Sequence, residues 1–144
     1  MPGSQASRSG RPEHSLTAPA ESASLEQVHA ALEALWGEYD DVTPSDRILF
    51  ETAVIEIAGN IAQHASAGVP LQFTLNLWVE PDRVEAEFRD HGRRVDIDLD
   101  VVVLPDDSAE SGRGLAMARA AVDELQYRRD GSTNHWRIVR RRQS

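Results

Sequence analysis

Three polar side chains recur at helical spacing within an otherwise apolar segment of the chain. Glu56, Asn60 and His64 lie four residues apart, so a helix would stack a carboxylate, an amide and an imidazole along one face. An asparagine oxygen is a suitable ligand for Mg²⁺, which commonly shares its coordination sphere with phosphates. A glutamate one turn earlier can position or deprotonate a nucleophile near the same phosphates. The stripe therefore predicts phosphate chemistry, and His64 is left open between a helix-terminal residue and a phosphate or partner contact.

Two glycine-containing motifs, Asp90-His91-Gly92 and Gly112-Arg113-Gly114, suit the same kind of ligand. A carboxylate at a strand end can accept a hydrogen bond from an adenine amino group, and the following glycine lets the backbone approach the ring. The other two glycines allow backbone N–H groups to face a phosphate at a helix N-terminus. Each motif alone is also common in ordinary turns, so the prediction depends on all three segments together.

Hydrophobic periodicity predicts the elements that would carry these motifs. Apolar residues at helical spacing indicate a helix at 24–39, with Ser24 as its N-cap. A second helix is expected to start with Thr43 as its cap and Pro44 at the first helical position, and to run to about Ala65. Alternation with period two then predicts an antiparallel hairpin of residues 71–79 and 83–89. The remaining elements expected are an edge strand at 15–18, a long connection at 93–111, a helix at Leu115–Leu125 and a hairpin of 126–129 and 134–139.

The order of these elements predicts the α+β fold class. Strands joined by short turns pair antiparallel, and amphipathic helices cover one face of the resulting sheet. We therefore expect a two-layer α/β sandwich with a mixed, mostly antiparallel sheet. Residues 1–14 are expected to be a disordered tail, because they are rich in small and polar residues, and residues 15–144 one domain.

Composition narrows the functional classes. The 144 residues carry a formal net charge of −9, which disfavours general nucleic-acid binding, and contain no cysteine for disulfides or thiolate metal sites. No apolar run has the length of a membrane span, and the start of the chain does not resemble a secretory signal, so a cytoplasmic location is expected. The six arginines between 128 and 142 are interpreted as a solvated strand face and terminus.

Taken together, the motifs resemble those of the Bergerat-fold (GHKL) ATPases, and more narrowly the anti-sigma-factor serine kinases of the RsbW/SpoIIAB type. The stretch AVIEIAGNIAQHA is similar to the N-box of that family, and FRDHGRRVD to its Asp-x-Gly box. The block ESGRGLAMARAAVDELQYRRDG, followed by NHWRIVRR, resembles the closing segment of the family. The resemblance covers residues 15–141, nearly the whole chain.

The resemblance implies a role for each motif residue, with ATP and Mg²⁺ as cofactors. Glu56 would be the catalytic carboxylate and Asn60 the Mg²⁺ ligand. Asp90 would read the adenine amino group, Gly92 would permit nucleotide approach, and Gly112, Arg113 and Gly114 would border the phosphates. Residues 93–111 would form the ATP lid.

The partners implied by the resemblance are proteins. Such kinases transfer the γ-phosphoryl group of ATP to a serine or threonine of a STAS-domain anti-anti-sigma factor, and they sequester a sigma factor, usually as homodimers. No direct nucleic-acid partner and no membrane partner is expected.

One departure from the family pattern keeps an alternative open. Arg93 and Arg94 stand where many relatives have a second glycine after the Asp-x-Gly motif. The alternative is a non-catalytic regulatory binding module of the same fold, with or without nucleotide. A third interpretation, the catalytic domain of a histidine kinase, is disfavoured because residues 1–23 are too short and polar to supply dimerisation helices with a phospho-accepting histidine.

Overall fold

The structure is a computed structural model that describes residues 10–64, 70–95 and 110–143. Within these ranges the chain forms five strands, three α-helices and one short 3-10 helix. In chain order they are β1 (His14–Pro19), η1 (Ser22–Ser24), α2 (Leu25–Glu38), α3 (Pro44–His64), β2 (Gln72–Val79), β3 (Arg83–Asp90), α4 (Glu110–Ala121), β4 (Glu124–Asp130) and β5 (Thr133–Arg141). None of the helices in these ranges has the length and apolar character needed to cross a bilayer.

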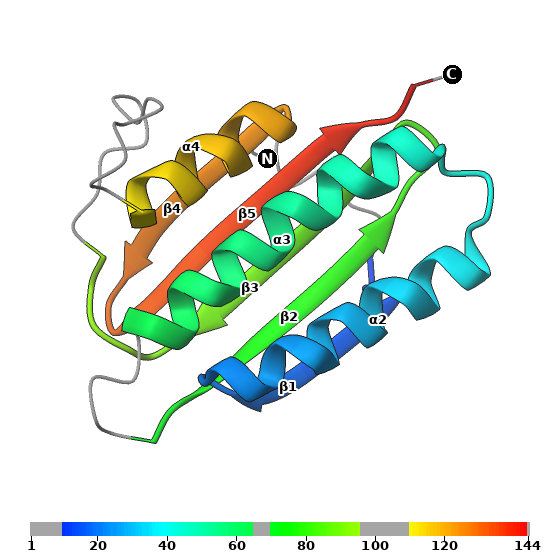
Figure 1. Cartoon of the computed structure of the whole chain (residues 1–144). Helices are drawn as coiled ribbons and strands as arrows, with labels where there is room; N and C mark the ends of the chain where they lie inside the picture. The colour runs from blue at the N-terminus through cyan, green and yellow to red at the C-terminus, as the bar shows by residue number, and fades with distance from the viewer. Residues whose placement is uncertain (1–9, 65–69, 96–109, 144) are drawn as a thin grey trace.

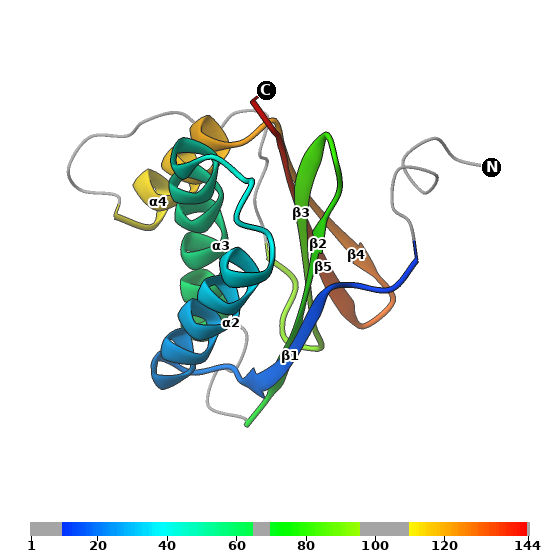
Figure 2. The ribbon, with the colours of Figure 1, turned by 90° about the vertical axis from the view of Figure 1, so that its right-hand side faces the viewer.

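The strands form one sheet in the order β1-β2-β3-β5-β4, and each of the four pairings in the described ranges is antiparallel. Helices α2, α3 and α4 all lie on one side of this sheet (Figures 1 and 2). The predicted α+β class and its two layers are therefore confirmed, as are both hairpins. The central pairing joins β3 to β5, which brings Asp90 opposite Asn134.

The core lies between the helices and the sheet. Alternate residues of the strands point toward the helices, as the period of two predicts, and they pack against the apolar positions of α3. The largest fully buried side chains include Phe50 and Ile57 from α3 and Phe88 and Trp136 from β3 and β5. This packing fixes α3 across the middle of the sheet, where it carries the predicted site residues.

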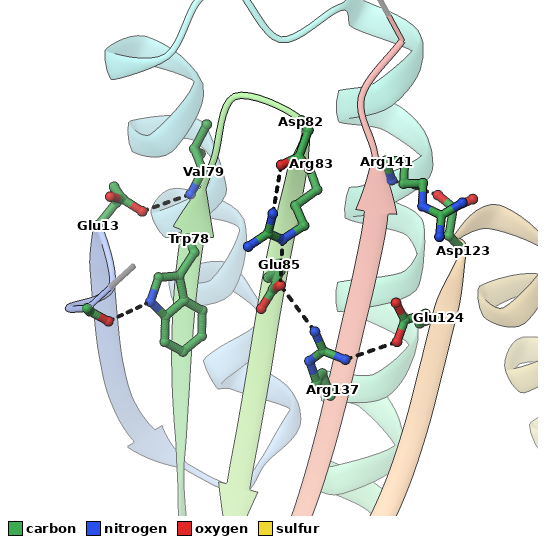
Figure 3. A network of polar contacts seen from close by, with 11 residues as sticks. Glu13, Trp78, Val79, Asp82, Arg83, Glu85, Asp123, Glu124, Arg137 and Arg141 are labelled. Atoms are coloured by element: carbon green, nitrogen blue, oxygen red, sulfur yellow. Dashed lines mark hydrogen bonds and ion pairs between the residues drawn. The ribbon is translucent and has the colours of Figure 1, made fainter. Parts of the chain in front are cut away.

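No described helix covers the opposite face of the sheet (Figure 2), and this face carries a cross-strand network of charged side chains (Figure 3). Glu85, whose side chain is fully buried, accepts hydrogen bonds from Arg83 Nε at 2.8 Å and Arg137 Nη2 at 3.2 Å. Arg137 Nη1 also donates to Glu124 at 2.9 Å.

The N-terminal segment is attached to the same face of the sheet. The buried indole of Trp78 donates a hydrogen bond to the carbonyl of Gly10 at 3.1 Å, which ties this segment to β2.

The start of α3 follows the sequence prediction closely. Thr43 Oγ1 accepts a hydrogen bond from the Asp46 N–H at 3.2 Å, which satisfies one of the free donors of the first turn. Pro44 occupies the first helical position, where its missing N–H costs nothing.

Several predicted boundaries were wrong. The last helix spans Glu110–Ala121 rather than Leu115–Leu125, so Gly112-Arg113-Gly114 lies inside the helix and not before it. Strand β4 accordingly begins at Glu124 instead of Gln126. Ser24 does occupy the N-cap position of α2, as predicted, but its side chain makes no capping hydrogen bond to the helix.

The predicted tail and lid fall partly outside the described residues. Residues 10–14 of the expected tail are described, and His14 already belongs to β1. Of the expected lid, residues 96–109 lie outside the described ranges, whereas Arg93, Arg94 and Val95 follow β3, and Glu110 and Ser111 begin α4.

Candidate functional site

The carboxylate of Glu56 lies directly against Gly114, where α3 packs on α4. A Cβ atom added to Gly114 would overlap with Glu56 Oε2 and would lie 3.3 Å from Glu56 Cδ. Only glycine at position 114 therefore leaves the carboxylate in its present place. This contact brings together two of the three predicted segments, and it explains the glycine by packing rather than by a turn.

Asn60 follows Glu56 by one turn of α3 and carries an unsatisfied donor. Its side-chain nitrogen is buried and has no hydrogen-bond partner among the described residues. Burying an amide without a partner costs free energy, so such a group marks a place where a ligand can supply the acceptor. The side-chain placement of His64, at the end of the same helix, lies outside the described residues.

Asp90 ends strand β3 with a nearly completely buried carboxylate. Its Oδ1 accepts hydrogen bonds from the backbone N–H of Gly92 at 2.8 Å and from Asn134 Nδ2 at 2.9 Å. The predicted Asp-x-Gly motif is thus a compact turn in which the aspartate closes onto the glycine N–H. Among the described residues no donor reaches the second oxygen, Oδ2.

Three residues outside the predicted motifs hold the Asp90–Gly92 turn in place. Tyr127, Arg129 and Asn134 come from the β4–β5 hairpin. Arg129 Nη1 donates to the Gly92 carbonyl at 2.6 Å, and the Tyr127 hydroxyl accepts the Val95 N–H at 2.9 Å. The signal that could have found them is the β3–β5 register, which places Asn134 opposite Asp90 and which the sequence pattern alone does not fix.

The start of α4 offers backbone donors from a different set of residues than predicted. Gly112 is the third helical residue, so its N–H belongs to the first turn, whose N–H groups have no acceptor within the helix. Gly114 is the fifth, and its N–H falls within the regular helical pattern. Gly112 therefore remains a candidate phosphate contact, whereas Gly114 contributes space for Glu56. The placement of the Arg113 side chain lies outside the described residues.

These segments come together at one end of the molecule. Helix α3 and strand β3 both end there, and helix α4 begins there, as Figure 1 shows. The arrangement presents a carboxylate (Glu56), an unsatisfied amide (Asn60) and a buried carboxylate (Asp90) from elements that share one core.

The polar groups of this site suit a bound nucleotide better than a metal ion that is held by protein ligands alone. The described part of the chain contains no group of three or more histidine, cysteine or carboxylate residues that could hold a metal. Asn60 is a single amide ligand, which is compatible with Mg²⁺ bound mainly through phosphates. The unsatisfied Asn60 nitrogen and the Gly112 N–H in the first turn of α4 are donors that phosphate oxygens could use, and Asp90 Oδ2 is an acceptor that an amino group could use.

Comparison with known proteins agrees with this geometry. A family model described as the histidine kinase-like ATPase domain matches residues 18–140. A search of curated proteins found no significant match.

Solved structures also match the chain, among them the following two. The crystal structure of the RsbU and RsbW domains of Rv1364c from Mycobacterium tuberculosis superposes with a TM-score of 0.61 at 21% sequence identity, covering 92% of this chain and 34% of that one. This chain thus corresponds to about a third of that protein's structure. The histidine kinase AdeS of Acinetobacter baumannii gives a TM-score of 0.49 at 16% identity, covering 97% of this chain and 72% of that one.

Proposed function

Because the chain belongs to the histidine kinase-like ATPase domain family, we propose that it is an ATP-binding anti-sigma factor and protein serine/threonine kinase of the RsbW type. The observation that carries the proposal is the contact of Glu56 with Gly114, which places a carboxylate beside the start of α4. The order of the three motifs along the chain, which resembles that of the anti-sigma kinases, supports the narrower assignment.

In the proposed reaction each site residue has a separate role. When bound, ATP supplies the γ-phosphoryl group, and ADP leaves. Glu56 accepts the proton of the attacking serine or threonine hydroxyl, and so increases the nucleophilicity of its oxygen. Asn60 would hold Mg²⁺, which would bind the phosphates, and the N–H of Gly112 would donate to a phosphate oxygen. Asp90 Oδ2 accepts a hydrogen bond from the adenine amino group, with Gly92 allowing the ring to approach.

The proposed partners are a STAS-domain anti-anti-sigma factor, which supplies the hydroxyl, and a sigma factor, which the protein sequesters as a homodimer. The net charge of −9 suits a basic protein partner better than a nucleic acid, because an acidic surface steers positively charged partners toward it.

The test is phosphoryl transfer from radiolabelled ATP to candidate STAS proteins. We expect Glu56→Ala to lower the transfer rate by about 100-fold or more, since general base catalysis commonly contributes that much. ATP affinity, measured by isothermal titration with Mg-ATP, should change little. The matched control is Glu26→Ala, which removes an exposed carboxylate from α2 and should leave transfer unchanged. Equal transfer by the Glu56 and Glu26 variants would remove Glu56 from the mechanism.

The alternative is a regulatory binding module without kinase activity. It is favoured by the exposed Arg93 and Arg94, which occupy the position of the second glycine in many relatives. The same two measurements separate the alternatives: binding of Mg-ATP without transfer to any STAS protein would support the non-catalytic module.

A further inference from the structure

Asn134 is a buried amide whose oxygen and nitrogen are both engaged. It lies in β5 with 1% of its surface exposed. Its Nδ2 donates to Asp90 Oδ1 at 2.9 Å and to the carbonyl of Arg93 at 2.8 Å. Its Oδ1 accepts hydrogen bonds from the Tyr127 hydroxyl at 2.5 Å and from Arg129 Nη1 at 3.0 Å. A buried polar group with this many partners has little freedom to turn.

The two neighbours on the oxygen side determine which way the amide faces. A guanidinium can only donate, so the atom of Asn134 that meets Arg129 must be the oxygen. The Tyr127 hydroxyl receives the N–H of Val95, so its own proton is directed to the same oxygen. The nitrogen of Asn134 is therefore obliged to face Asp90, and it does so as a donor.

This orientation occupies one oxygen of Asp90 and leaves the other for a ligand. Oδ1 receives two donors, Asn134 Nδ2 and the Gly92 N–H. Oδ2 has no hydrogen-bond partner among the described residues. If the amide were absent, the carboxylate could rotate and exchange its oxygens, and its alignment toward a ligand would no longer be fixed.

We propose that Asn134 is a positioning residue that directs Oδ2 of Asp90 toward the 6-amino group of a purine nucleotide. The inference rests on the proposed function, because it assumes that Asp90 reads the base of a bound nucleotide. It adds that selectivity for adenine depends on a residue 44 positions away in sequence, which acts through Asp90 and not by touching the base. Tyr127 and Arg129 contribute by holding the amide in its orientation.

The experiment compares the binding of ATP with that of purine riboside triphosphate, which lacks the 6-amino group. Wild-type protein is expected to bind ATP at least about tenfold more tightly, the value of one hydrogen bond to a charged group. In Asn134→Ala this ratio should fall to between one and about threefold, through loss of ATP affinity, while the affinity for the analogue changes little. A merely structural role for Asn134 would weaken both ligands equally and leave the ratio unchanged.

The matched control is Asn76→Ala, which removes a buried asparagine from β2 that pairs with Ser15 at 2.7 Å. This variant should keep the wild-type ratio of ATP affinity to purine riboside triphosphate affinity. If Asn134→Ala does not fold, Tyr127→Phe provides the test, because it keeps the ring packed on Trp136, 4.8 Å between centroids, and removes only the hydroxyl. It too should lower the ratio.

The outcomes separate this inference from the proposed function. Wild-type protein that binds neither nucleotide would overturn both. Wild-type protein that prefers ATP, with the same preference in the Asn134 and Tyr127 variants, would overturn the role of Asn134 and leave the proposed function standing.

Discussion

Gly114 shows how one missing side chain sets the position of another. The carboxylate of Glu56 occupies the volume that a Cβ at position 114 would need. The atom that would have to move is the far end of a flexible side chain, so the structure can accept a larger residue by displacing the carboxylate. A larger residue at position 114 would then reduce the catalytic activity of Glu56 more than the free energy of unfolding.

We therefore expect Gly114→Ala to reduce phosphoryl transfer strongly while leaving the fold intact. A displacement of about 1 Å at a reacting group can lower the rate by about 100-fold. The free energy of unfolding should change by less than about 1 kcal/mol, because the better helix propensity of alanine offsets the strain. Transfer kinetics and urea unfolding measure the two effects.

The control for this variant is Gly37→Ala in α2. Nothing lies within 4 Å of a Cβ at position 37, so the same substitution meets open space there. It should stabilise the protein by up to about 1 kcal/mol and leave transfer unchanged. Equal transfer rates for the two alanine variants would show that Gly114 does not control the position of Glu56.

The residues of the candidate site differ in how far the sequence could predict them. Glu56 and Asp90 belong to local motifs with a chemical meaning, so they could be selected without a structure. Asn134 could not, because an asparagine in a strand has no distinctive pattern until the β3–β5 register places it beside Asp90. The role of Gly114 was also missed, since a glycine near a helix start is ordinarily read as part of a turn.

At the scale of the elements, the start of α3 is anchored to the end of the chain through a buried ion pair. Asp46 is fully buried, and its two oxygens accept hydrogen bonds from Arg140 Nε at 2.9 Å and from the Gln143 N–H at 2.8 Å. Arg140 also donates to the carbonyl of Ala121, the last residue of α4, at 2.9 Å. One arginine of β5 thus links the N-terminus of α3 to the C-terminus of α4.

We expect Asp46→Ala to lower the free energy of unfolding by about 3 kcal/mol, because it leaves the largely buried Arg140 side chain, 13% exposed, without its counter-ion. The control is Asp82→Ala: Asp82 pairs with Arg83 at 2.7 Å, but its side chain is 75% exposed, so the loss should stay below about 1 kcal/mol. Urea unfolding followed by circular dichroism gives both values. Similar losses for the two variants would contradict a special role for the buried pair.

Element boundaries were predicted well where a cap or a period change marked them and poorly where glycine was the only signal. Thr43 and Pro44 located the start of α3 to the residue. Helix α4 was predicted to begin at Leu115, because Gly112-Arg113-Gly114 was interpreted as the turn that opens the helix. The helix nevertheless includes residues 112–114, since close packing on α3 favours a glycine there over its intrinsic propensity.

For the molecule as a whole, His135 on the sheet face opposite the helices contributes to how stability responds to acid. His135 lies on β5 between Arg89 of β3 and Arg128 of β4. Partial burial, and then the charge of Arg128, lower the pKa of His135 below its ordinary value of 6.5. The neighbouring carboxylates of Glu87 and Asp130 act in the opposite direction but do not cancel this shift.

The sign of the resulting pH dependence follows from this shift. Because the unfolded chain binds the proton more readily than the folded protein, the contribution of His135 to stability is present above pH 6.5 and is lost as the pH falls through its lowered pKa. We expect His135→Gln to lose less stability than wild type between neutral pH and pH 5. Urea unfolding across this range tests it, and parallel pH profiles for the two proteins would exclude the effect.

The strand order also has a consequence for the folding pathway. The β2–β3 and β4–β5 hairpins each join neighbours in sequence, whereas β3 and β5 pair only after the chain between them has closed, at a higher entropic cost. Asp90 lies on one hairpin and Asn134 on the other. A partly folded chain with two separate hairpins would therefore lack an oriented carboxylate. A nucleotide that hydrogen-bonds to Asp90 would stabilise only the complete five-stranded sheet. Adding the nucleotide would therefore slow unfolding rather than accelerate folding.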